Sequence, residues 1–197
     1  MLVYKFIKIP YVVDALEYGI YAGKITDFND PYEYEGILYP DQFRVCCMTS
    51  SNKQMLMWAH YGFHRQFCVG FEIEESDRVQ KVKYDLRYEP HRYMDVSEIK
   101  NSLYKKAKEW EYEKEIRIVL DINNDSGFEA VNGEYYYPAI PRSVLIGLNV
   151  DVQNDEVLEI FNYINNMKNK IEVKKCMLSN TRYEIIWDRQ FDYKKYL

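Results

Sequence analysis

The sequence predicts an α/β protein of the α+β type, with a split, mostly antiparallel sheet flanked by a few helices. Strand-like segments outnumber helical ones, and neighbouring strand-like segments lie close enough in sequence to pair as hairpins. The 197 residues are enough for one well-filled core, and no repeat, low-complexity tract or long linker divides them. We therefore expect a single domain over residues 1–197.

In the first third of the chain, the pattern predicts two strands and two helices. Residues 2–9 form a strand-like apolar run. A helix follows, with Pro10 in its first turn and apolar residues at helical spacing, and Gly23 is expected to close it. Residues 43–48 are β-branched and apolar, as in a buried strand, and residues 52–66 read as a helix with one apolar stripe.

The rest of the chain alternates between strands and helices. Residues 68–73 and 79–84 predict strands. Residues 95–110 begin with a capping box and carry an apolar stripe that ends at Trp110, whose ring we expect to pack inside the protein. Residues 123–133, rich in Asn, Asp and Gly, predict a hairpin connection. The remaining segments are a strand at residues 144–147, a helix at 157–167 and late strands at 171–173 and 183–187.

The stretch from Trp110 to Leu120 combines charged and apolar residues in alternation. If residues 113–120 are extended, Glu113, Glu115 and Arg117 share one face of the strand. Two like charges on one face repel each other unless a cation or a ligand lies between them. The pattern indicates either an exposed ladder of charges or a paired-carboxylate site at the start of a strand.

A polar turn is expected at residues 28–33, because proline keeps the residue before it out of the α region. The turn is either an ordinary connection or a loop that lines a pocket. In the second case Asn29, Asp30 and Glu33 would present three polar groups at one bend.

Composition narrows the classes of partner. The net charge of −5 and the pI near 5.4 give no broad attraction to nucleic acid or anionic lipid. No apolar run has membrane-spanning length and no secretory leader is visible, so we expect a cytoplasmic protein without a membrane partner. The four cysteines lack C-x-x-C pairs, and His60 and His64 lack an accompanying Glu, so we expect reduced thiols and no metal site.

Three motifs in order carry a resemblance to a known family. They are Phe28-Asn29-Asp30-Pro31-Tyr32-Glu33, then Met57-Trp58-Ala59-His60-Tyr61 followed by Gly70, and finally Trp110-x-x-Glu113-x-Glu115-x-Arg117. Together they resemble a bacterial family of unknown function that is scattered through genomes, often among defence genes. The resemblance covers nearly the whole chain and implies no activity by itself.

The order of the elements is also similar to the ADP-ribosyltransferase superfamily, whose members split NAD at the bond between nicotinamide and ribose. This resemblance implies that Glu115 is the catalytic acid and Glu113 the second acid of an E-x-E pair. Tyr61 would stack on the nicotinamide, with Ser50 in Thr49-Ser50-Ser51 as the alternative. A carboxylate bonded to the ribose hydroxyl would favour the oxocarbenium-like transition state over the substrate.

The first motif of that superfamily is a His or Arg on the first strand, and Tyr4-Lys5 stands there in this chain. Lys5 donates hydrogen bonds but lacks the planar shape of His or Arg. The residues expected to contact NAD are Tyr4, Lys5, Asn29, Asp30, Ser50, Tyr61 and Arg117.

Two hypotheses of function follow. One is an NAD-dependent ADP-ribosyltransferase or NAD glycohydrolase of a phage-defence or toxin system, with a protein or nucleic acid as acceptor. The other is a non-catalytic module that binds a nucleotide or a protein on the same fold, which the departure at Lys5 favours. Convergence of Lys5, Tyr61 and Glu115 on one cleft would support the enzyme.

Overall fold

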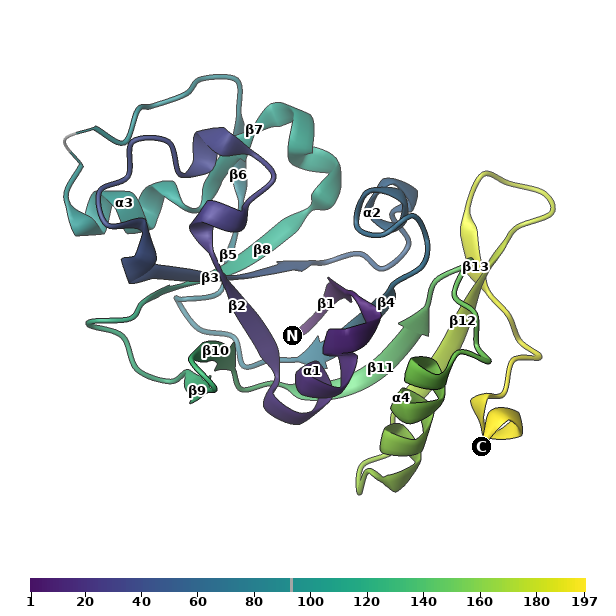
Figure 1. Cartoon of the computed structure of the whole chain (residues 1–197). Coiled ribbons are helices and arrows are strands. Elements are labelled where there is room, and N and C mark those ends of the chain that lie inside the picture. Colours follow the sequence, from purple (N-terminus) through teal and green to yellow (C-terminus); the bar gives the residue numbers. More distant parts are fainter. Residues whose placement is uncertain (93) are drawn as a thin grey trace. The chain divides into compact units, whose positions relative to one another are not determined.

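The computed structural model describes residues 1–92 and 94–197 and has an α+β architecture with short helices (Figure 1). The chain divides into two compact units. The first unit consists of Met1–Gly19, Ser51–Ile73 and Ala139–Leu197. The second unit consists of Ile20–Ser50 and Glu74–Pro138.

The first unit contains five strands of a mixed sheet and three α-helices. In the order β13-β12-β11-β4-β1, all neighbours are antiparallel except β11 and β12, which α4 connects (Figure 1). Its elements are β1 (Leu2–Ile7), a 3-10 turn (Ile9–Tyr11), α1 (Val12–Tyr18), α2 (Met55–His60), β4 (Phe67–Glu72), β11 (Ile140–Ile146), α4 (Asp155–Asn166), β12 (Glu172–Leu178), β13 (Ile185–Trp187) and a 3-10 turn (Tyr193–Tyr196). A buried cluster around Trp58 fills its core.

The second unit contains an antiparallel set of strands in the order β5-β8-β3-β2-β10-β9 and a separate parallel pair, β6 and β7. Its strands and α-helix are β2 (Ile20–Lys24), β3 (Phe43–Thr49), β5 (Gln80–Lys81), β6 (Lys83–Asp85), α3 (Val96–Ser102), β7 (Lys105–Ala107), β8 (Glu115–Asp121), β9 (Glu129–Val131) and β10 (Glu134–Tyr137). Short 3-10 helices are η2 (Ile25–Asp27), η3 (Pro31–Glu33), η4 (Pro40–Gln42) and η5 (Lys108–Glu113).

The core of the second unit forms where α3 packs on β3 and β8. Asp95 caps α3 and Glu98 completes the capping box, as the sequence predicts. Ile99 and Leu103 then enter an apolar cluster that includes Phe43, Val45 and Val119. All seven residues of β8 are buried, polar ones included, and β3 and β5 pair with its two edges.

Two helices in the first half of the chain are shorter than the sequence predicts. The helix expected to close at Gly23 ends at Tyr18, because Gly19 has φ 102° and the next residues form β2. Of the helix expected over residues 52–66, only α2 (Met55–His60) forms an α-helix. Gly62, with φ 146°, is the first residue after α2 with a positive φ, and Phe63 and His64 follow with left-handed φ values of 55° and 61°, so the helix does not continue.

The helix expected over residues 95–110 is also wrong beyond Ser102. Residues 105–107 pair in parallel with β6, and residues 108–113 form the 3-10 helix η5. The strand starts at Glu115 rather than at Glu113, because Lys114 has φ 48° and reverses the chain between them. Pairing with a partner strand overrides the helical spacing of the apolar residues here.

The predicted α+β class, the mainly antiparallel pairing and the small number of helices are confirmed. The single domain over residues 1–197 stays a prediction. In the part of the chain that the structure describes, no helix is both long and apolar enough to cross a membrane.

Candidate functional site

Five charged side chains meet inside the second unit, and all five are buried. They come from η3, β7, the end of η5 and the first half of β8. We call this group the ion cluster; its members are Glu33, Lys106, Glu113, Glu115 and Arg117.

Local structure positions each carboxylate of the ion cluster. Asp30 caps η3 by accepting a 3.1 Å hydrogen bond from the backbone N–H of Tyr32, and this turn directs Glu33 inward. On β8, Glu115 and Arg117 are two residues apart and therefore share a face. Glu113 is the last residue of η5, and its side chain also enters the ion cluster.

The guanidinium of Arg117 contacts two carboxylates, a backbone carbonyl and an aromatic ring. Its Nε and Nη2 donate hydrogen bonds of 2.8 Å each to the two carboxylate oxygens of Glu115. Its Nη1 donates to the carbonyl of Leu103 at 2.6 Å and contacts Glu33 Oε1 in an ion pair. The guanidinium also lies 5.0 Å from the centre of the Phe28 ring. This geometry fixes the guanidinium plane and leaves it buried.

Lys106 connects all three glutamates. Its Nζ lies 2.6 Å from Glu113 Oε2, 3.3 Å from Glu115 Oε2 and 3.6 Å from Glu33 Oε2. The same nitrogen lies 4.7 Å from the centre of the Trp110 ring. The neighbouring glutamates raise the pKa of Lys106 despite its burial, so the lysine stays charged.

The cluster contains three carboxyl groups and two cations, so one negative charge is in excess if every carboxyl is ionised. Burial alone would raise the pKa of Glu115, but Arg117, Lys106 and the Cys47 thiol lower it to about 2. Glu33 behaves oppositely: burial raises its pKa more than the two cations lower it. Glu33 therefore carries a proton more readily than Glu115 does.

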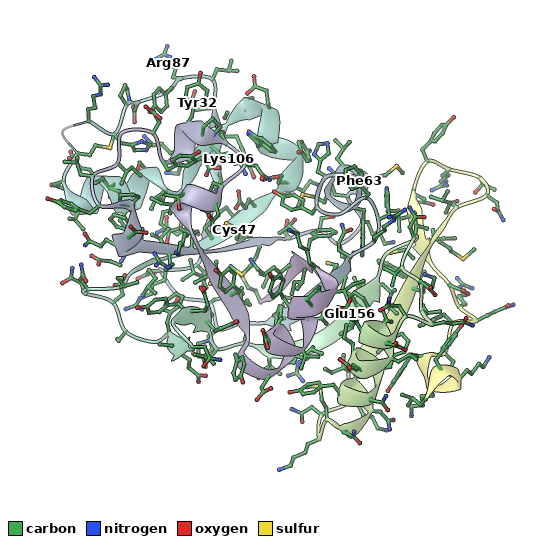
Figure 2. The ribbon with its side chains drawn as sticks, in the orientation of Figure 1. Tyr32, Cys47, Phe63, Arg87, Lys106 and Glu156 are labelled. Atoms are coloured by element: carbon green, nitrogen blue, oxygen red, sulfur yellow. The ribbon has the colours of Figure 1, made fainter. Side chains whose placement is uncertain are left out.

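A cavity of about 440 Å³ lies next to the ion cluster. Its buried lining residues are Asp30, Glu33, His91 and Lys106, which we call the floor. Its rim includes the exposed residues Tyr32, Arg87 and Tyr88, and Figure 2 labels Tyr32 and Arg87 with Lys106 in this part of the unit. The volume falls in the range of small-molecule sites.

Two floor residues, Asp30 and Glu33, have carboxylate oxygens without a hydrogen bond from a described residue, although Glu33 forms an ion pair with Arg117. Asp30 is 3% exposed, and its Oδ1 accepts from the N–H of Tyr32. Its Oδ2 is buried and has no hydrogen-bond partner among the described residues. Because a buried carboxylate oxygen without a donor is unfavourable, this oxygen indicates a place for a ligand's N–H or O–H group.

Two tyrosines give the rim an aromatic surface. The rings of Tyr32 and Tyr88 lie 5.0 Å apart at 59°, and they are 59% and 41% exposed as residues. The hydroxyl of Tyr88 and Nδ1 of His91 both bond the carbonyl of Glu35, at 3.3 and 2.9 Å. Since a carbonyl only accepts, His91 carries its proton on Nδ1 when it is neutral.

The structure brings together part of the predicted site. Glu113, Glu115 and Arg117 meet in the ion cluster, and Asp30 lines the cavity beside it. The alternative prediction of an exposed charge ladder is wrong, because Glu113, Glu115 and Arg117 are all buried. Their common strand face is also wrong for Glu113, which lies before the strand and reaches the cluster through Lys106.

The other predicted NAD contacts are not among the residues that line the cavity. Asn29 is exposed beside Asp30, and exposed Ser50 donates its N–H to the carbonyl of Lys114 at 3.3 Å. Tyr4, Lys5 and Tyr61 belong to the first unit, where Tyr61 stacks 6.3 Å from Phe6. The convergence of Lys5, Tyr61 and Glu115 stays a prediction.

Sequence reasoning missed Lys106 and the rim residue Tyr88. The sequence pattern predicts one helix over residues 95–110 and so gives Lys106 no role in a site. In the structure Lys106 lies on the strand β7. Glu33 had a signal, since it shares the polar turn with Asp30. Tyr88 follows β6 in an irregular segment and has no pattern that separates it from the other tyrosines.

Comparisons of the chain with protein families, with curated proteins and with solved structures gave no match. Among residues 1–92 and 94–197, no group of three or more His, Cys, Asp or Glu side chains has an arrangement that would hold a metal ion.

Proposed function

We propose that the second unit binds a nucleotide in the cavity, and that this nucleotide is NAD. One observation carries the proposal: a buried carboxylate oxygen of Asp30 lies without a donor on the floor of a cavity of ligand size. NAD is the nucleotide that the resemblance to ADP-ribosyltransferases implies. The protein then acts as a nucleotide-binding module.

The chemistry of the cavity supports a ligand with a flat, cationic end. The nicotinamide ring of NAD is positively charged and carries a carboxamide with two N–H donors. Tyr32 and Tyr88 offer aromatic faces to such a ring. Asp30 offers the acceptor for the carboxamide. The phosphates would face the rim, where the exposed cations are Arg87 and Lys105 and the exposed carboxylates are Asp85, Glu89 and Glu109, so Arg87 is the group proposed to contact them.

Binding is favoured over catalysis by the state of Glu115. Both of its oxygens accept hydrogen bonds from Arg117, and one also contacts Lys106. Glu115 bonds a ribose hydroxyl only if one of these contacts is given up. Its role in the binding module is to fix Arg117 and Lys106, and through Lys106 the floor of the cavity.

ADP-ribosyl transfer or NAD hydrolysis is the second candidate. It is favoured by one observation: Glu113 and Glu115, the predicted acid pair, both contact the lysine that lines the cavity. Displacement of Lys106 by substrate would bring a carboxylate of this pair to the cavity wall. In this candidate Glu115 carries the chemistry and Glu113 assists, with a protein or nucleic acid as acceptor.

Calorimetry with NAD tests the binding proposal. We expect wild type to bind NAD and Tyr32→Ala to bind it about tenfold more weakly, because one face of the aromatic rim is lost. Tyr183→Ala is the matched control, since Tyr183 is fully exposed in the first unit. Absence of NAD binding by folded wild type would overturn the proposal.

The second candidate needs a separate measurement. Nicotinamide release from NAD is followed with protein, RNA and DNA acceptors, for wild type, Glu115→Gln and Glu113→Gln. Loss of a preorganised catalytic carboxylate lowers rate about a hundredfold to a thousandfold. If wild type binds NAD and releases no nicotinamide, the binding module stands and the enzyme is rejected.

A further inference from the structure

The two oxygens of Asp30 have different environments. Oδ1 caps η3, and its partner is the backbone N–H of Tyr32. Oδ2 belongs to the same buried carboxylate and has no hydrogen bond from a described residue, and Asp30 is one of the residues that line the cavity. The first oxygen fixes the orientation of the side chain, so the second is held at a defined place on the floor.

Polar groups nearby are already committed. Lys106 has its closest contact with Glu113 and lies within 3.6 Å of two further carboxylates. Nδ1 of His91 donates to the carbonyl of Glu35. The side chain of Glu33 adds a second carboxyl group to the floor; it forms an ion pair with Arg117, and neither of its oxygens has a hydrogen bond from a described residue. An N–H or O–H group of a ligand would supply the donor that Oδ2 of Asp30 lacks.

We propose that Asp30 is the specificity-determining residue of the cavity: its Oδ2 accepts an N–H from the carboxamide of a nicotinamide ring and discriminates against the corresponding carboxylate. The inference rests on the proposed binding of NAD in this cavity. It assigns the orientation of the ligand, with nicotinamide toward Asp30 and phosphates toward the rim.

The discrimination follows from hydrogen-bonding capacity. A carboxamide donates through its nitrogen, so it supplies the hydrogen that Oδ2 lacks. A nicotinate group is a carboxylate at neutral pH and only accepts, so its oxygen would face another oxygen of the same charge. Sites built around one buried polar group strongly reject an analogue that leaves the group unpaired.

The test compares two dinucleotides that differ at this group. NAD and nicotinic acid adenine dinucleotide are titrated calorimetrically into wild type, Asp30→Asn and Asp41→Asn. Asparagine keeps the cap of η3 and the size of the side chain, and it offers an N–H₂ where Asp30 has an oxygen. Asp41 is exposed on η4 and outside the cavity, so its variant controls for the loss of one carboxylate.

We expect wild type and Asp41→Asn to bind the nicotinate dinucleotide on the order of a hundredfold more weakly than NAD. Asp30→Asn, checked by circular dichroism, should reduce that ratio to less than about threefold, because its N–H₂ group donates equally to an oxygen of the carboxamide or of the nicotinate. The wild-type ratio tests the inference even if Asp30→Asn does not fold.

Two results would overturn the inference in distinguishable ways. Equal binding of the two dinucleotides by wild type rejects the role of Asp30 and leaves NAD binding intact. Binding of neither dinucleotide rejects the proposed function, and the inference falls with it. A folded Asp30→Asn variant that keeps the wild-type ratio also rejects the role of Asp30.

Discussion

Arg117 donates two hydrogen bonds of 2.8 Å to the two carboxylate oxygens of Glu115, which precedes it by two residues on the same strand. Such paired contacts between a guanidinium and a carboxylate are strong and directional. Both side chains are buried, so the contact is shielded from solvent. Glu115 therefore has a structural role whether or not the protein has an activity.

Glu115→Gln should lower the free energy of unfolding by about 3–5 kcal/mol at pH 7, because it removes one charge of a buried pair and leaves Arg117 partly uncompensated. The pKa of Glu115 falls from 4.5 to about 2 in the folded protein. Its ionised form thus stabilises the fold above pH 4.5, and that contribution is lost as pH falls toward 2. Urea denaturation at pH 7 and pH 3 measures both effects.

Glu111→Gln is a suitable control for Glu115→Gln. Glu111 is exposed and its ion pair with Lys108 is a surface contact, so its loss should cost less than about 1 kcal/mol. Equal losses of stability in the two variants would contradict the structural role of Glu115.

Glu33→Gln should show the opposite dependence on pH. Burial raises the pKa of Glu33 above its usual 4.5, so the folded state favours the protonated form. The stability that this form contributes is complete below pH 4.5 and is lost as pH rises through the raised pKa. Glutamine cannot ionise, so the stability of Glu33→Gln relative to wild type should increase with pH. Thermal unfolding of both proteins from pH 4 to pH 8 measures this difference, and a constant or falling difference would contradict it.

Trp58 and Trp110 should differ in their contribution to stability. Trp58 is 0% exposed and its Nε1 donates to the carbonyl of Asn52 at 2.9 Å, so Trp58→Ala should cost about 3–5 kcal/mol. Trp110 is only partly buried beneath Lys106, so the loss in Trp110→Ala should be about 1–2 kcal/mol. This corrects the expectation that Trp110 packs in the interior. Denaturant titrations of both variants measure the two losses of stability, and a larger loss in Trp110→Ala than in Trp58→Ala would contradict the prediction.

Most strands of this fold are visible in the sequence because their residues alternate or form short apolar runs. The predicted strands at residues 2–9, 43–48 and 68–73 match β1, β3 and β4 within about two residues at each end. The capping box at Asp95 also correctly marks the start of α3. These signals are local, so a single sequence contains them.

The site depends on contacts between distant segments, which the sequence predicts less well. Strand geometry alone puts Glu115 and Arg117 on one face, so the sequence predicts that these two residues belong to a site. The sequence does not predict that Lys106 belongs to it, because the position of Lys106 depends on the pairing of β7 with β6. Likewise the burial of Glu33 follows from its contacts with Lys106 and Arg117, which lie more than seventy residues away in the chain.

Replacement of Lys106 is the strongest test of the ion cluster as one unit. In Lys106→Gln, the carboxyl groups of Glu33, Glu113 and Glu115 would share Arg117 as the one remaining cation of the cluster. The loss of a buried cation should lower stability by about 3–5 kcal/mol at pH 7. Lys105→Gln is the matched control, because Lys105 is adjacent, exposed and paired with the exposed Glu89, and its loss should cost less than about 1 kcal/mol.

The dependence on pH distinguishes electrostatic loss from lost packing. Lys106 lowers the pKa values of Glu33 and Glu115, so both values should rise in the folded variant, and protonation of these two groups offsets part of the loss at low pH. The stability difference between wild type and Lys106→Gln should therefore be smaller at pH 4.5 than at pH 7. Urea denaturation of wild type, Lys106→Gln and Lys105→Gln at both values measures it. A difference that is the same at both values would show that Lys106 contributes through the packing of its side chain, and the electrostatic account of the cluster would be rejected.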